Sequence, residues 1–132
     1  MGDQVNTHKD PGIKKKSFKL AKNIYQVTRK FPKEEIFGIT SQMRKYTVSI
    51  PSNITEGAAR YSSKEFRQFL NITLGSVSEL DTQVQQLKEF GYFSYPSGIE
   101  NQINSVRKLP IGLRKSITNK TIDHTSQITY YT

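Results

Sequence analysis

A run of core-type residues between Phe66 and Leu87 constrains the fold of this chain more than any other feature. Its members alternate at spacings of four and three: Phe66, Leu70, Thr73, Val77, Leu80, Val84 and Leu87. That alternation keeps the side chains on one face of an α-helix through three heptads. Phe69 and Leu74 make the stripe wider than the seam of a two-stranded coiled coil. The segment therefore predicts a long helix packed within a bundle.

The sequence also marks both ends of this helix. Glu65 follows Ser62 by three residues, the spacing of a capping box in which the serine hydroxyl accepts the Glu65 amide hydrogen. Gly91 stands where a residue in the left-handed conformation commonly ends a helix. We therefore expect the helix to begin just after Ser62 and to end just before Gly91.

Two earlier segments show the same helical periodicity. Residues 13–30 predict a first helix, which Pro32 ends; its apolar stripe consists of Leu20, Ile24, Val27 and Phe31, widened by Phe18, Ala21 and Tyr25. A second stripe belongs to a helix expected to end near Arg60, with a break at Gly38; it consists of Ile36, Ile39, Met43, either Tyr46 or Thr47, Ile50, Ile54 and Ala58. Because this stripe continues past Pro51, we expect one kinked helix here rather than two helices.

A fourth helix is expected to start near Pro96, with Ile99, Ile103 and Val106 on its apolar face. Pro110 and Gly112 interrupt this pattern, and whether the helix continues to Ile117 stays open. The chain is thus divided into a disordered leader (1–12), a bundle (13–117) and a flexible tail (118–132). Short connections between apolar-faced helices favour antiparallel neighbours, so the fold class is all-α, an up-and-down antiparallel four-helix bundle with a kinked second helix.

Five ordered blocks carry a resemblance to a known family. They are Phe31-Pro-Lys-Glu-Glu, Thr40-Ser-Gln-Met-Arg-Lys, Ser49-Ile-Pro-Ser-Asn-Ile-Thr-Glu-Gly57, Glu65-Phe-Arg-Gln-Phe-Leu70 and Leu74-Gly-Ser-Val-Ser-Glu-Leu80. Together they resemble the four-helix bundle proteins encoded in intervening sequences of 23S ribosomal RNA genes, to which the accessory protein of diversity-generating retroelements is related. Thr55, where the family usually has Ala, and Pro110 depart from the family pattern.

The resemblance implies an up-down-up-down bundle, a homopentamer, a cytoplasmic location and no established catalytic activity. For the retroelement branch it also implies a basic surface that meets nucleic acid, with a reverse transcriptase as protein partner. The residues quoted do not decide between the branches.

The residues themselves also argue against an enzyme. The only histidines, His8 and His124, fall in the expected leader and tail, so the bundle lacks a histidine base or metal ligand. There are no cysteines and no glycine-rich phosphate loop, and no apolar stretch long enough to span a membrane. We therefore expect no enzymatic activity, no metal, no cofactor and no membrane association.

Four polar residues near the apolar stripes are expected to form a structural network rather than a catalytic site: Arg44, Asn53, Glu56 and Glu79. A carboxylate close to a core needs hydrogen bonds or a cation to offset its lost hydration. We therefore predict that Glu56 or Glu79 pairs with an arginine of a neighbouring helix.

Positive charge is concentrated at the start of the chain. The formal net charge is +9, and residues 1–33 alone hold nine Lys or Arg and two Asp. The candidate nucleic-acid-binding residues of this segment are Lys14, Lys15, Lys16, Lys19, Lys22, Arg29 and Lys30. Lys15, Lys19, Lys22 and Arg29 recur opposite the apolar face, as a stripe that follows phosphates would. No aromatic side chain is expected among them.

The sequence therefore predicts a non-enzymatic, homo-oligomeric bundle that binds structured RNA or DNA through its first helix, with a reverse-transcriptase accessory role within that class. The alternative is a protein-interaction scaffold in which the basic charge is incidental and serves only solubility.

Overall fold

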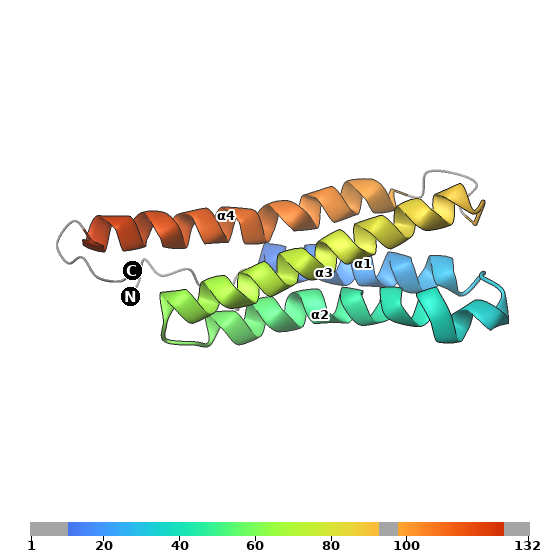
Figure 1. The fold of residues 1–132 in the computed structure, drawn as a ribbon, viewed down its shortest axis with the longest axis horizontal. Helices are drawn as coiled ribbons and strands as arrows, with labels where there is room; N and C mark the ends of the chain where they lie inside the picture. The colour runs from blue at the N-terminus through green and yellow to red at the C-terminus, as the bar shows by residue number, and fades with distance from the viewer. Residues whose placement is uncertain (1–10, 93–97, 126–132) are drawn as a thin grey trace.

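The computed structural model describes residues 11–92 and 98–125, and these fold into an elongated four-helix bundle (Figure 1). Its long helices are α1 (Pro11–Thr28), α2 (Ser41–Ala58), α3 (Ser63–Glu89) and α4 (Ile99–Thr125). Successive helices run in opposite directions, and no strand occurs in either described range. The prediction of an all-α, up-and-down antiparallel four-helix bundle is confirmed.

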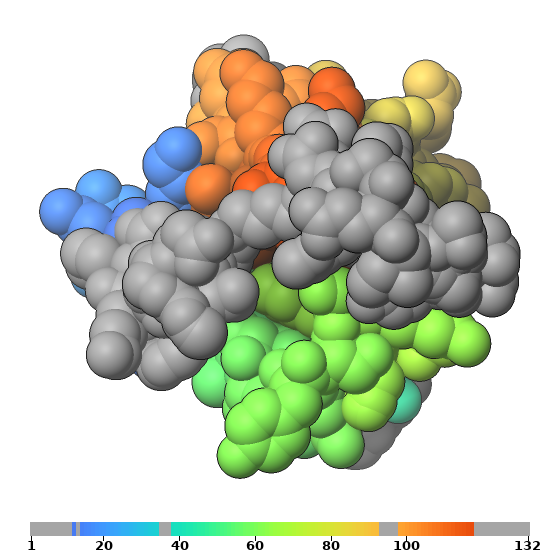
Figure 2. All heavy atoms as spheres, turned by 90° about the vertical axis from the view of Figure 1, so that its left-hand side faces the viewer, coloured from blue at the N-terminus to red at the C-terminus, as the bar shows by residue number. Residues whose placement is uncertain are grey.

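Each helix packs against the two helices that precede and follow it around the bundle. α2 contacts α1 and α3, and α4 contacts α3 and α1, with the most extensive interface between α2 and α3. Helices α1 and α3 therefore lie on opposite sides of the bundle. Seen end-on, the exposed atoms of α1 and those of the second half of α3 emerge on opposite sides (Figure 2).

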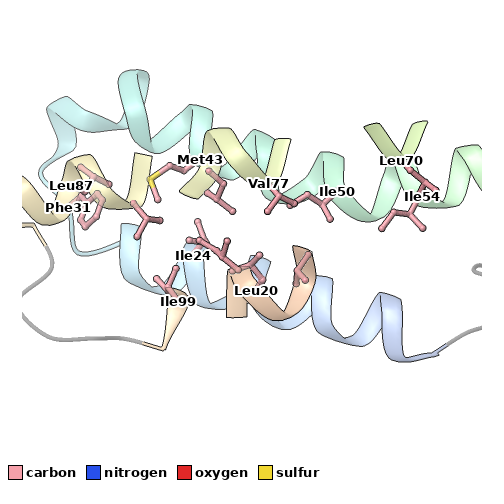
Figure 3. Close-up of a cluster of buried hydrophobic side chains, with 14 of the residues drawn as sticks. Leu20, Ile24, Phe31, Met43, Ile50, Ile54, Leu70, Val77, Leu87 and Ile99 are labelled. Carbon is pink, nitrogen blue, oxygen red and sulfur yellow. The ribbon is translucent and has the colours of Figure 1, made fainter. Parts of the chain in front are cut away.

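The core lies between the four inner faces and runs along the bundle axis (Figure 3). Among the described residues the α3 stripe supplies the largest share of it, because every apolar member of the Phe66–Leu87 run is at most 8% exposed. Opposite it lie Leu20 and Ile24 from α1, Met43, Ile50 and Ile54 from α2, and Ile99, Ile103 and Val106 from α4. The heptad-like spacing thus predicted the buried face of α3 correctly.

Hydrogen bonds satisfy both ends of α3 as its sequence predicts. The Glu65 amide donates to Ser62 Oγ at 3.2 Å, and Ser62 is the N-cap. Gly91 has φ of 82°; its amide donates to Lys88 O, and the Tyr92 amide donates to Leu87 O. This pair of bonds is a Schellman motif, in which a left-handed glycine lets the last carbonyls find donors. Phe31 then packs on Tyr92, with ring centroids 5.1 Å apart.

Both internal prolines lie within continuous helices. α2 passes through Pro51, so one helix forms rather than two, as predicted; its bend stays a prediction. Proline has no amide hydrogen, and hydroxyl groups beside it donate to nearby carbonyls, Ser49 Oγ to Tyr46 O and Ser52 Oγ to Val48 O. α4 likewise passes through the buried Pro110.

The helix ends differ from the expected division of the chain. α4 continues to Thr125, so its last turns occupy residues expected to form the start of the tail. α1 begins at Pro11, within the expected leader. The rest of the leader, residues 1–10, and of the tail, residues 126–132, lies outside the described residues.

A close approach of α2 and α3 accounts for Gly57. A Cβ atom at this position would lie 2.6 Å from Phe69 Cβ and 3.0 Å from Phe66 Cδ1. Only a residue without a side chain fits there, so Gly57 belongs to the interface between two helices of the same bundle. Gly75 differs, because nothing lies within 4 Å of the corresponding position.

A candidate nucleic-acid interface on helix α1

Helix α1 separates an inner face from a strongly basic outer face. Ser17, Leu20, Ile24 and Thr28 are buried against the other helices. Of the seven candidate cations, Lys14 is half-buried and the others are exposed: Lys15, Lys16, Lys19, Lys22, Arg29 and Lys30. We call these seven side chains the α1 basic surface; five belong to α1, and Arg29 and Lys30 directly follow its last residue, Thr28.

The α1 basic surface has no carboxylate partner among the residues whose side chains are described. The ion pairs there join other residues: Arg60 to Glu56, Lys88 to Glu100 and Arg107 to Asp81. α1 itself contains no Asp or Glu. The positive charge of this helix is therefore not neutralised by an ion pair in that part of the chain.

The helices that flank α1 add few negative charges. α2 contributes only Glu56, and the described side chains of α4 contribute only Glu100; both are already paired with a cation. The carboxylates of α3 are on the helix diagonal to α1: Glu65, Glu79, Asp81 and Glu89. The helix positions thus separate positive and negative charge across the bundle, which strengthens the field outside α1.

Helix α2 extends this surface through Arg44 and Lys45. The Arg44 guanidinium lies 4.6 Å from the centre of the Tyr25 ring, its Nε donates to Thr28 Oγ1 at 3.0 Å, and its Nη2 lies 3.5 Å from Tyr25 O. Beside it is an open hollow of about 570 Å³. The hollow is lined by Tyr25, Ser41, Arg44, Lys45, Val48 and Ser49. We call it the Tyr25 hollow; it forms only where α2 packs on α1, so the basic residues of the first helix alone do not indicate it.

Phe18 corrects an expectation drawn from the sequence. The sequence places Phe18 in the apolar stripe and predicts no aromatic side chain among the lysines. Its side chain is instead 58% exposed, one helical turn from both Lys14 and Lys22. A position at the border of a stripe can be buried or exposed, and the neighbouring helices decide which. Here α2 and α4 leave Phe18 largely uncovered.

The four residues of the expected polar network do not bond to one another. Arg44 bonds to α1, as above, and Asn53 Nδ2 donates to Ser49 O within α2 at 2.8 Å. Glu56 pairs at 2.8 Å with Arg60, one turn later in the chain rather than on a neighbouring helix. Glu79 is exposed and has no bonding partner among the described residues.

An ion pair between helices does form, but from other residues. Arg107 of α4 reaches Asp81 of α3 at 2.7 Å, with both side chains largely covered. The rotation of two helices about their axes decides which carboxylate faces an arginine. That rotation turns Asp81 toward α4 and leaves Glu79 exposed.

No grouping of three or more His, Asp or Glu side chains suited to a metal ion occurs within the part of the chain described. His8 lies outside the described residues, and the side chain of His124 is not among those described. None of the described helices is long and apolar enough to cross a membrane.

Comparison with known proteins identifies the family. Residues 9–112, most of the chain, match the model of the 23S rRNA-intervening sequence protein family. A search of curated proteins gives no match. The matched residues cover α1, α2, α3 and the first half of α4, which together form the bundle. The chain therefore belongs to the 23S rRNA-intervening sequence protein family.

Proposed function

We propose that this protein is a non-enzymatic bundle that binds nucleic acid by contacting phosphates through the α1 basic surface. The observation that carries the proposal is the set of seven cations, five on α1 and two directly after it, with no carboxylate partner among the described side chains. Lysine and arginine side chains displace the counterions condensed on a nucleic acid, and this release favours binding. Arg44 and Lys45 continue the positive surface onto α2.

The proposed contacts are to the backbone more than to base edges. Seven of the nine cations named are lysines, whose ammonium groups act as point charges and lack the two-pronged geometry that reads a guanine edge. Such contacts fix a protein on its target without reading sequence. The proposed target class is accordingly structured RNA or DNA, recognised by charge and shape.

The proposal includes assembly of several copies, a homopentamer as the family resemblance implies, in the cytoplasm. Each added copy would bring another α1 basic surface to the same nucleic acid and raise the effective affinity. A role beside a reverse transcriptase is one setting in which such a bundle would act. Light scattering coupled to size-exclusion chromatography measures the mass and so tests the assembly.

The first test is binding of labelled structured RNA, duplex DNA and single-stranded DNA, followed by fluorescence anisotropy over a range of salt concentrations. We expect binding that weakens steeply with salt. Replacing Lys15, Lys19 and Lys22 by Glu removes three exposed cations from the surface. If all three contact duplex phosphates, the slope of log K against log salt falls by about 2–3 units.

A matched variant changes the same total charge elsewhere. Lys33, Lys64 and Lys108 are exposed, lie outside α1 and have no ion pair among the described residues, so replacing them by Glu leaves α1 intact at the same net charge. We expect the matched variant to bind far more tightly than the α1 variant. Equal losses in both would show that net charge alone drives association, and unchanged binding in the α1 variant would refute the assignment to α1.

A second candidate function is a scaffold that docks a partner protein. Exposed apolar side chains favour it, since Ile72 on α3 is 52% exposed and Phe90 just after α3 is 70% exposed. Docking through such side chains would depend little on salt, whereas phosphate binding depends on it strongly. Absence of nucleic-acid binding even at low salt would favour the scaffold.

A further inference from the structure

We propose that the α1 basic surface binds unpaired nucleotides, with the Phe18 ring as the platform on which a base stacks. This inference rests on the proposed function and narrows its target to single-stranded segments, such as the loops and ends of a structured RNA. The starting observation is that Phe18, a large apolar side chain, is 58% exposed on a helix whose outer face is otherwise basic.

The neighbours of Phe18 along α1 supply the phosphate contacts that stacking needs. Lys14 and Lys22 are four residues away on either side, which places each about 6 Å from Phe18 along the helix axis. Lys15, three residues before Phe18, lies on the same side of the helix. A strand that runs along α1 would thus meet a cation, a ring and a second cation in order.

This combination differs from the surroundings of Phe90 and Tyr61, the other large aromatic side chains that are exposed among the described residues. Phe90 is 70% exposed, but it follows Lys88, which is paired with Glu100, and adjoins the carboxylate of Glu89. Tyr61 is fully exposed in the turn that joins α2 to α3, beside the ion-paired Arg60. Phe18 has unpaired lysines one turn away in both directions, and α1 has no acidic residue to repel a phosphate.

A second contact for the strand lies two turns further along α1. One side of α1 faces α4, where Asn23 donates a hydrogen bond to Gln102. The other side faces α2, where the Tyr25 ring lies against the Arg44 guanidinium. Phe18 is seven residues before Tyr25, and seven residues are close to two full turns, so Phe18 lies on the α2 flank as well. The Tyr25 hollow is therefore on the same side, about 10 Å away along the axis.

The preference for unpaired nucleotides follows from the chemistry of stacking. In a duplex both faces of every internal base are already stacked on other bases, so an exposed aromatic ring cannot stack on them. A single strand offers free faces, and stacking on an aromatic side chain tolerates any base. Phe18 should therefore strengthen binding of single strands and leave duplex binding to the lysines.

The absence of tryptophan from the chain allows a direct test of stacking. The Phe18→Trp protein carries a single indole at the proposed platform, and the Phe90→Trp protein carries one at a matched exposed site. The probes are an oligothymidylate of about 20 nucleotides, an abasic strand of the same length and charge, and a duplex. We expect the oligothymidylate, but neither of the other two, to quench the indole emission of the Phe18→Trp protein. The Phe90→Trp protein should stay unquenched.

Affinities complete the test. The Phe18→Ala variant should bind the oligothymidylate about 5- to 100-fold more weakly and the duplex within about twofold of the unchanged protein. The Phe90→Ala variant should match the unchanged protein on both probes. Circular dichroism checks that the variants keep their helix content.

The outcomes separate the two proposals. Suppose that the unchanged protein binds all three probes with a salt-sensitive affinity, and that neither the Phe18→Ala substitution nor the removal of the bases weakens binding. Phosphate binding then stands, and the stacking inference is overturned. Quenching by the duplex equal to that by the single strand would also overturn it. If no probe binds at low salt, the proposed function itself fails, and the inference fails with it.

Discussion

Helices α1 and α3 lie diagonally across the bundle and divide its properties between them. The buried side of α3 is apolar over almost its whole length, with Phe66, Leu70, Val77, Leu80, Val84 and Leu87 in the core. The buried side of α1 is half polar, because Ser17 and Thr28 are two of the four buried residues among the described side chains of this helix. The outer sides differ as well: α3 carries both signs of charge and α1 only positive charge.

The comparison indicates that stability and binding depend on different helices. α3 removes more apolar surface from water and has hydrogen-bonded caps at both ends, so it contributes most to folding. α1 buries less and presents unpaired cations, whose mutual repulsion slightly disfavours the folded state and favours association with a polyanion. Changes to α3 should therefore alter the free energy of unfolding, and changes to the outer face of α1 should alter binding.

The largest effect on stability is expected from Leu80→Ala. Leu80 is 0% exposed, and its truncation loses transfer free energy and leaves a cavity, at a cost of about 2–5 kcal/mol. Urea unfolding followed by circular dichroism, at fixed protein concentration, measures the loss. Nucleic-acid affinity of the folded variant should be unchanged at low temperature. A weak effect on stability together with a large loss of binding would reverse the roles assigned to the two helices.

The two glycines of the α2–α3 pair should respond to alanine in opposite directions. Gly57→Ala puts a methyl group against Phe69 Cβ, which is fixed to the backbone, so α2 and α3 must separate slightly, at a cost of about 1–3 kcal/mol. Gly75→Ala meets no neighbour within 4 Å and gains about 0.5–1 kcal/mol from helix propensity.

The same unfolding experiment measures both glycine variants. Stabilisation of both would mean that the α2–α3 interface yields easily and that its packing contributes less than we infer. Destabilisation by Gly75→Ala would point to a contact made by the outer face of α3 in an assembly of several copies.

The same comparison explains which features the sequence could predict. The buried face and the ends of α3 depend on signals within the helix itself: a regular spacing, the Ser62 cap and Gly91. At Pro110 two local signals conflict, because proline commonly ends a helix whereas the apolar residues after it continue the helical spacing. Burial of Ile117 and of Pro110 itself offsets the loss of one backbone hydrogen bond, and α4 continues.

The features that the sequence could not predict depend on how helices are rotated against each other. Phe18 is at the edge of an apolar stripe, so its exposure is decided by α2 and α4. The pairing of Asp81 with Arg107, in place of Glu79 with an arginine, likewise depends on the facing of α3 and α4. The basic surface of α1 can be predicted from the sequence, because its cations follow one another along the chain and α1 contains no acidic residue. The contribution of Arg44 and Lys45 cannot, because it depends on how α2 packs on α1.

An effect as small as that of Gly75→Ala is expected at the polar inner face of α1. Ser17 is 1% exposed, and its Oγ has no hydrogen-bond partner among the described residues. Burial of an unsatisfied hydroxyl is unfavourable, so Ser17→Ala should stabilise the bundle, by about 1 kcal/mol. Because the change lies opposite the α1 basic surface, it should leave the salt dependence of nucleic-acid binding as it was. A destabilising result would mean that a buried water or another copy of the chain forms a hydrogen bond with Ser17. The polar inner face of α1 would then contribute more to stability, relative to the apolar face of α3, than we infer.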